Sequence, residues 1–150
     1  MRVFSTLDEV SGAIGEELGT SDWLEIDQDR VNRFAEATGD HQWIHVDVER
    51  SKDGPFGGTI AHGYLTLSLV PYLGSQVLSF ETPGAKLNYG ANKVRFPHPV
   101  LVGKRIRAHV ALADVADLPK GKQATLVYTV EIEGEAKPAL VAETIVLLLP

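Results

Sequence analysis

The amino-acid sequence predicts an α+β fold in which a curved antiparallel sheet wraps around a central buried helix. The segment 62–73 is apolar on nearly every side, which is typical of a helix buried in the interior. After Pro83 and Gly84 the pattern changes to long runs of alternating apolar and polar residues joined by short turns, which is typical of an antiparallel meander. A sheet that covers one buried helix must curve around it, and this layering is α+β.

The chain before the buried helix begins with an amphipathic segment. A first helix is expected to start at Thr6, which forms a capping box with Glu9, and to end at Gly19. The apolar face of this helix consists of Leu7, Val10, Ile14 and Leu18. Residues 23–26 are expected to form a short strand.

A second helix is expected with Asp27 as its N-cap and Gly39 at its end. Residues 40–60 are expected to form a long loop, and loops of this length inside a compact domain are usually functional. Asp40 therefore lies just past a helix end, where a loop can direct its side chain.

The strands are expected in the second half of the chain, at 86–96, 102–115, 124–132 and 139–149. The first of them is expected to be interrupted at Gly90. Pro71 is expected to kink the buried helix or to end its first part, because proline lacks the N–H that continues the helical hydrogen bonds.

The composition predicts an ordinary globular protein. A chain of 150 residues is expected to form one domain, spanning 1–150. The net charge of −6 and the absence of a basic run argue against a nucleic-acid surface, and no apolar run approaches the length of a membrane span. The absence of cysteine excludes disulfides and thiolate chemistry, and the first residues do not resemble a signal peptide. We expect a cytoplasmic protein.

The residues that point to chemistry lie in two short motifs. Asp40 and His45 share the run 39–45, and a carboxylate and an imidazole on one loop can share a water molecule. Gly63 follows Ile-Ala-His at the start of the buried helix, where an unhindered N–H can stabilise an oxygen that gains negative charge. These are the groups needed to add water across an activated double bond.

Each of these residues also has an ordinary interpretation. An Asp after a helix commonly binds backbone N–H groups, and a lone histidine is commonly a buried or surface residue without a catalytic role. A glycine at a helix start can simply permit a close approach to another backbone. The functional interpretation depends on finding all three residues in one arrangement.

The order of the motifs resembles that of a known family. Gly39, Asp40, Ile44 and His45 precede the Ile-Ala-His-Gly run 60–63, and these are followed by the runs Asn88-Tyr89-Gly90, Lys93-Val94-Arg95-Phe96-Pro97 and Pro99-Val100. Over residues 20–150 the chain is similar to the MaoC-like (R)-specific enoyl-CoA hydratases of the hotdog fold. It departs from the family pattern at Gln42 and Trp43, where Asn and Pro are usual.

The resemblance implies a reversible syn addition of water to a trans-2-enoyl-CoA, giving an (R)-3-hydroxyacyl-CoA. It implies that Asp40 and His45 share the acid–base work and that Gly63 N–H stabilises the thioester oxygen. The substrate would be an acyl-CoA in a tunnel near the interface of an edge-to-edge homodimer or of a dimer of dimers. CoA belongs to the substrate, and no cofactor is expected.

Five further residues are candidates for substrate binding. Gln42 can donate and accept hydrogen bonds as Asn would, and Tyr64 lies where pocket depth is set. Tyr89 and Arg95 are candidates for contact with the carrier of the thioester, and Arg95 in a strand is equally a candidate for a structural ion pair. His62 is included as a neighbour of Gly63, although a capping or packing role suits it better than a catalytic one.

Two other functions and a metal site are alternatives to this hypothesis. In a hotdog thioesterase a carboxylate would activate water against the thioester carbonyl, and a non-catalytic acyl-binding subunit of a dehydratase heterodimer would lack Asp40 or His45. His41, His45, His62 and His98 have no supporting cluster of Cys or carboxylates at ligand spacing, so no metal is expected.

Overall fold

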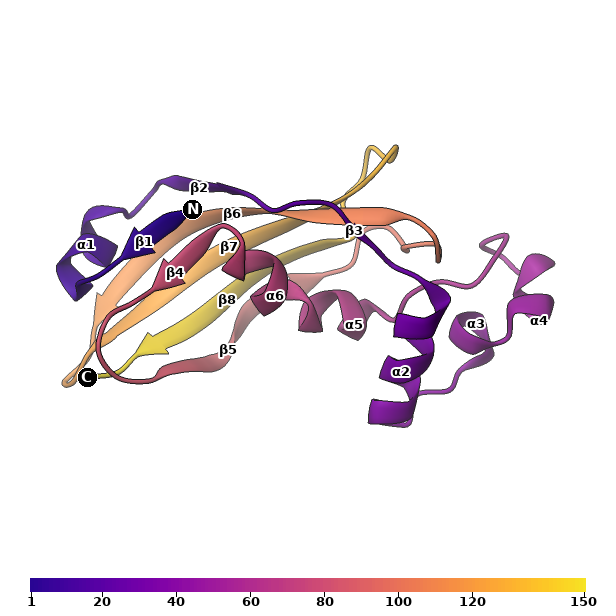
Figure 1. The fold of residues 1–150 in the computed structure, drawn as a ribbon, viewed down its shortest axis with the longest axis horizontal. Helices are drawn as coiled ribbons and strands as arrows, with labels where there is room; N and C mark the ends of the chain where they lie inside the picture. Colours follow the sequence, from indigo (N-terminus) through magenta and orange to yellow (C-terminus); the bar gives the residue numbers. More distant parts are fainter.

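A computed structural model describes residues 1–150, all of the chain. A six-stranded antiparallel sheet dominates it, with the strand order β2-β6-β7-β8-β5 and with β3 pairing on β6 (Figure 1). The elements in chain order are β1 (Arg2–Phe4), α1 (Leu7–Gly12), β2 (Glu17–Thr20), β3 (Leu24–Glu25), α2 (Gln28–Thr38), α3 (Trp43–Val46), α4 (Val48–Lys52), α5 (Gly63–Ser68), α6 (Val70–Ser75), β4 (Leu78–Phe80), β5 (Lys86–Arg95), β6 (Arg105–Asp117), β7 (Lys122–Ile132) and β8 (Leu140–Leu148).

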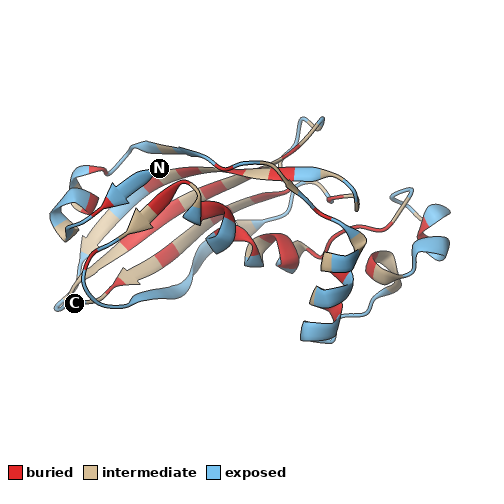
Figure 2. Ribbon diagram, viewed as in Figure 1, coloured by how far each residue is buried: buried red, intermediate tan, exposed pale blue.

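The predicted meander is confirmed in β6, β7 and β8, which are joined by short turns and pair in sequence. β5 returns to pair with β8 and forms an edge of the sheet, with register shifts on either side of Gly90, where an interruption is expected. Figure 2 shows β5 exposed along its length, while the inner strands alternate between buried and partly buried residues.

The core lies between α5–α6 and one face of this sheet. Leu65, Leu69 and Leu73 of the helices belong to one apolar cluster, together with every second residue along parts of β6 and β7. The strand residues of this cluster that are no more than 5% exposed include Ala108, Val110, Leu112, Leu126, Tyr128 and Val130. Burial of each large apolar side chain stabilises the fold by about 1.5–3 kcal/mol. The predicted sheet around a central helix is confirmed.

The buried helix differs from the prediction in two respects. It is divided between α5 and α6 at Leu69, and Pro71 lies in the first turn of α6, as expected for a residue that cannot continue the preceding helix. The prediction that it is buried on most sides is wrong for one stripe. The exposed residues of that stripe are Tyr64, Ser68, Pro71, Tyr72 and Ser75.

The first helix is shorter than predicted. The capping box of Thr6 and Glu9 is present, but α1 ends at Gly12. Leu18 lies instead in β2, because the chain from Gly15 onward forms hydrogen bonds with β6. Pairing with a neighbouring strand outweighs local helix preference here. The parallel pair β1–β4 was also not predicted.

The prediction of one long loop at 40–60 is wrong, since this segment contains the short helices α3 and α4. Trp43 fixes this segment: its carbonyl accepts a hydrogen bond from Ser51 Oγ at 3.2 Å, and the Arg50 guanidinium lies 4.0 Å from the centre of its ring. Cation–π contacts of this kind contribute about 0.5–1 kcal/mol at exposed sites. α2, α3 and α4 lie together at one end of the molecule (Figure 1).

Candidate active site

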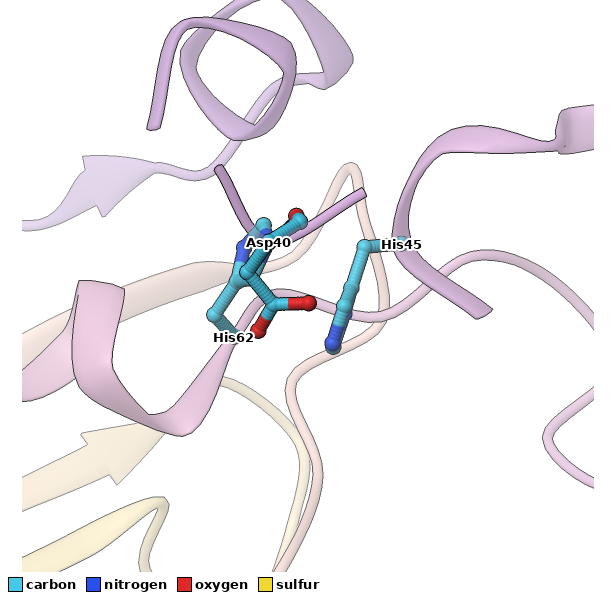
Figure 3. Close-up of side chains that lie close together, drawn as sticks. All are labelled: Asp40, His45 and His62. Atoms are coloured by element: carbon cyan, nitrogen blue, oxygen red, sulfur yellow. The ribbon is translucent and has the colours of Figure 1, made fainter. Parts of the chain in front are cut away.

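Asp40 is positioned by the end of α2. Gly39 ends this helix in the left-handed region, with φ of 80°, where glycine carries no steric penalty. The backbone then turns, and Gln42 N–H donates to Asp40 Oδ1 at 3.4 Å. The helix end and this turn direct the exposed carboxylate toward His45 (Figure 3).

His45 is held in one tautomer. Its Nδ1 lies 2.7 Å from the carbonyl oxygen of Ile60, and a carbonyl oxygen can only accept, so Nδ1 carries hydrogen. In the neutral imidazole Nε2 is then the unprotonated nitrogen. The side chain is 6% exposed, and this burial lowers the pKa of His45 below its ordinary value. His45 is therefore a neutral base with a defined accepting nitrogen.

His62 lies behind these two residues. Its Nε2–H donates to the carbonyl oxygen of Asp40 at 3.0 Å, and its ring stacks on that of His45 with centroids 3.9 Å apart. The ring of Phe34 packs on another side of His62, with ring centroids 4.9 Å apart, and His62 is only 2% exposed. A side chain so enclosed fits a role in packing and in positioning Asp40 and His45, and its contact with substrate stays a prediction.

The three side chains form a compact cluster. One ligand-type atom from each of Asp40, His45 and His62 lies within 4.8 Å of the others. Two acceptors at such a separation can each take a hydrogen bond from one water molecule at ordinary distances of about 2.7–3.0 Å. The cluster can thus hold and deprotonate a water molecule.

The same residue types occur in metal sites, but their arrangement does not favour one. The rings of His45 and His62 are only 22° from parallel. Nitrogen lone pairs lie in the ring plane, so stacked rings direct them side by side and not toward one ion. One nitrogen of each ring is also occupied by a backbone carbonyl. The expectation of no metal stays a prediction.

Gly63 opens α5 close to the cluster. Its N–H forms no hydrogen bond within the chain, as is usual for the first residue of a helix. Gly63 and His45 line the same cavity of about 340 Å³, which we call the Gly63 cavity. A Cβ atom added to Gly63 would lie 3.2 Å from the ring of Phe96, so glycine leaves room between the helix and this wall.

Two further residues support the site, and the sequence analysis missed both. Gln28 donates from Nε2 to the carbonyl oxygen of His45 at 2.8 Å, and its Oε1 accepts from Thr59 Oγ1 at 2.7 Å. Phe96 forms the wall opposite Gly63. Gln28 lies in the first turn of a helix far from the motif, and no local pattern marks it.

The remaining predicted binding residues are dispersed. Gln42 and Arg95 are exposed, and Tyr64 and Tyr89 line two separate cavities. The Tyr64 cavity, of about 490 Å³, shares Phe96 with the Gly63 cavity. The Tyr89 cavity, of about 820 Å³, shares Leu67 and Ser68 with the Tyr64 cavity. The three cavities thus follow one another along α5 and α6.

None of the helices combines the length and the apolar character that crossing a lipid bilayer requires.

Comparison with known proteins gives a consistent result. The MaoC like domain matches residues 9–133. The chain is 56% identical to 3-hydroxyacyl-thioester dehydratase Z of Mycobacterium tuberculosis over 147 residues, which cover 97% of each protein. It is 33% identical to 3-hydroxybutyryl-CoA dehydratase of Methylorubrum extorquens over 121 residues, covering 79% of this chain and 73% of the relative.

A solved structure supports the same grouping. The (R)-hydratase from A. caviae involved in PHA biosynthesis superimposes with a TM-score of 0.71 and 27% identity, over 91% of this chain and 98% of that one. The hotdog fold, the order of the Asp40, His45 and Gly63 motifs and these relatives agree. The chain belongs to the MaoC-like dehydratase family and is an enzyme of the hydratase and dehydratase class.

Proposed function

We propose that the chain catalyses the reversible syn addition of water to a trans-2-enoyl-CoA, giving an (R)-3-hydroxyacyl-CoA. One O–H bond of water breaks, the oxygen bonds to the β carbon, and a proton bonds to the α carbon. The observation that carries this proposal is the pairing of the Asp40 carboxylate with a buried, tautomer-fixed His45 within 4.8 Å.

The pair activates the water. His45 Nε2, unprotonated because Nδ1 is bonded to Ile60, takes a proton from the water molecule. The Asp40 carboxylate accepts a hydrogen bond from the O–H that the water keeps and orients the oxygen lone pair toward the β carbon. The proton returns to the α carbon from the same pair, on the same face of the double bond. Addition is therefore syn.

Gly63 is the proposed hydrogen-bond donor to the thioester oxygen. As water attacks, the electron pair moves to the thioester oxygen, which becomes enolate-like. The N–H of Gly63 has no acceptor in the protein and borders the same cavity as His45. A donor held in place before the reaction stabilises the developing charge without reorganisation.

The acyl chain extends from Gly63 along α5 and α6 toward the Tyr89 cavity. Gly63 and Gly74 are separated by about 16 Å along the helical path, at the usual rise per residue. Arg95 is exposed and forms no ion pair within the chain, so its charge is available to a phosphate of the CoA carrier.

The proposed function is tested with crotonyl-CoA and with trans-2-dodecenoyl-CoA. Loss of the absorbance of the conjugated thioester without release of a free thiol is expected for both. Release of free CoA would identify a thioesterase. Failure to turn over either substrate, with tight binding of both, would identify a non-catalytic acyl-binding protein.

The pH profile follows from His45. Burial has the largest effect and lowers its pKa, while the hydrogen bond to the Ile60 carbonyl opposes this. His62 lowers the pKa further, and the Asp40 charge has the smallest effect and raises it. The base must be unprotonated, so activity persists until the pH falls through this lowered value. An unperturbed histidine titrates at pH 6.5, so the acid limb of the kcat/KM profile is expected below this pH. A limb above that pH would contradict a desolvated His45 as the base.

The oligomeric state follows from β5. This edge strand exposes its backbone groups and the side chains of Leu87 and Tyr89, which are 50% and 64% exposed. Pairing of this edge across a two-fold axis would cover it. We propose a homodimer or a dimer of dimers. Light scattering at micromolar concentration is expected to give a molar mass at least twice the monomer mass of 16.3 kDa. A measured mass equal to that of the monomer would contradict the assembly.

A further inference from the structure

The hydroxyl group of Tyr128 lies in the Tyr89 cavity without a partner. Tyr128 is on β7, on the face of the sheet that packs against α6, and is 5% exposed. It lines the Tyr89 cavity, and its oxygen forms no hydrogen bond with any group of the chain. The oxygen is not one of the fully buried unpaired atoms of the chain, so it is reached from the cavity, where water or a ligand can accept its hydrogen bond.

The hydroxyl lies close to the backbone of α6 at Gly74. A Cβ atom added to Gly74 would lie 2.5 Å from the Tyr128 oxygen, so a side chain larger than glycine cannot stand above it. Burial raises the pKa of Tyr128 to about 12, so the group stays protonated and acts as a neutral donor.

Three other hydroxyl groups around the cavity already donate to backbone carbonyl oxygens. Ser68 donates to the carbonyl oxygen of Tyr64 at 2.6 Å, and Ser75 donates to that of Tyr72 at 2.6 Å. Thr144 donates to the carbonyl oxygen of Leu126 at 3.5 Å. The hydroxyl groups of Ser79, Tyr89 and Tyr128 have no such partner, and only Tyr128 among them is a buried residue. Tyr128 therefore presents a free donor from the inner wall of a largely apolar cavity of about 820 Å³. A cavity of this size with few directed polar groups is typical of a ligand site whose polar groups fix orientation.

We propose that Tyr128 is a specificity-determining residue that donates a hydrogen bond to a neutral oxygen on the distal part of the acyl chain. The preferred substrate is a long 2-enoyl thioester whose chain carries a carbonyl, hydroxyl or ether oxygen. This inference rests on the proposed function and on the acyl chain reaching the Tyr89 cavity. An unsubstituted alkyl chain leaves the Tyr128 hydroxyl unpaired and is a poorer substrate of the same length.

The test compares the unaltered enzyme with Tyr128→Phe, which removes only the hydroxyl. The substrates are trans-2-dodecenoyl-CoA and a series of its oxo derivatives, with the carbonyl stepped along the distal half of the chain. The unaltered enzyme is expected to prefer one oxo position by about 5- to 10-fold in kcat/KM, the range of a single neutral hydrogen bond. Tyr128→Phe is expected to lose that preference and to hydrate crotonyl-CoA at the unaltered rate.

Thermal unfolding separates this inference from the proposed function. Loss of an unpaired buried hydroxyl is expected to leave the Tm of Tyr128→Phe equal to or above that of the unaltered protein, whatever the enzyme's activity. A marked fall in Tm would show that the hydroxyl has a partner within the protein and would overturn the inference. So would equal kcat/KM for all positions of the carbonyl, or a preference that persists in Tyr128→Phe. If no enoyl thioester is hydrated, the proposed function fails instead.

Discussion

Replacement of Asp40 with Asn, or of His45 with Asn, is expected to lower kcat for hydration of crotonyl-CoA by about 10²–10⁴-fold. Asn at 40 lacks the carboxylate charge that orients the water and shares in the return of the proton. Asn at 45 can still donate to the carbonyl oxygen of Ile60, as Nδ1 does, but has no basic nitrogen. Both variants should therefore fold normally, which circular dichroism and thermal unfolding check.

The double variant distinguishes a cooperating pair from two independent residues. Because Asp40 and His45 act on one water molecule, loss of both is expected to cost far less than the product of the two single losses. Asp53→Asn is the matched control, since Asp53 is an exposed carboxylate at the end of α4 and lies outside the cluster. Activity near that of the unaltered enzyme in either single variant would remove that residue from the mechanism.

Replacement of Gly63 with Pro is expected to lower kcat by about 10²–10³-fold, because it deletes the N–H proposed to stabilise the thioester oxygen. The backbone permits this change. Gly63 is the first residue of α5 and is not in the left-handed region, and His62 has φ of −59° and ψ of 137°, which suits a residue before proline.

Gly63→Ala is the control for crowding. Both variants place a Cβ atom about 3.2 Å from Phe96, but only alanine keeps the N–H. A clearly smaller loss is expected for alanine than for proline. Equal losses would indicate that the added carbon blocks the substrate, and a fully active proline variant would show that Gly63 N–H has no role.

The sequence was sufficient for the architecture wherever a local signal and the tertiary structure agree. α2 begins after Asp27 and ends at Gly39, as predicted, because an N-cap side chain and a left-handed glycine act within one helical turn. The strand expected at 124–132 lies within β7, because alternating apolar residues such as Leu126, Tyr128 and Val130 are buried on one face of the sheet. Leu18 was misassigned because its helical spacing is overridden by the pairing of β2 with β6, which lies far away in the sequence.

The sequence predicts which residues form the candidate site, but it does not predict how they contact one another. The motif placed Asp40 and His45 on one segment, yet the tautomer of His45 depends on the carbonyl of Ile60, and its backbone is held by Gln28. His62 was foreseen as a neighbour of Gly63, whereas its contacts with Asp40 and His45 arise only from folding. Side chains that act through such tertiary contacts leave no pattern in the sequence.

Hydration of crotonyl-CoA in deuterium oxide tests the central claim most directly, namely that one pair of residues delivers hydroxyl and proton to the same face of the double bond. The product is analysed for configuration at the hydroxyl-bearing carbon and for the placement of deuterium at the α carbon. The account predicts (R)-3-hydroxybutyryl-CoA with deuterium in the syn position only. An (S) product, or deuterium placed anti or on both faces, would contradict it.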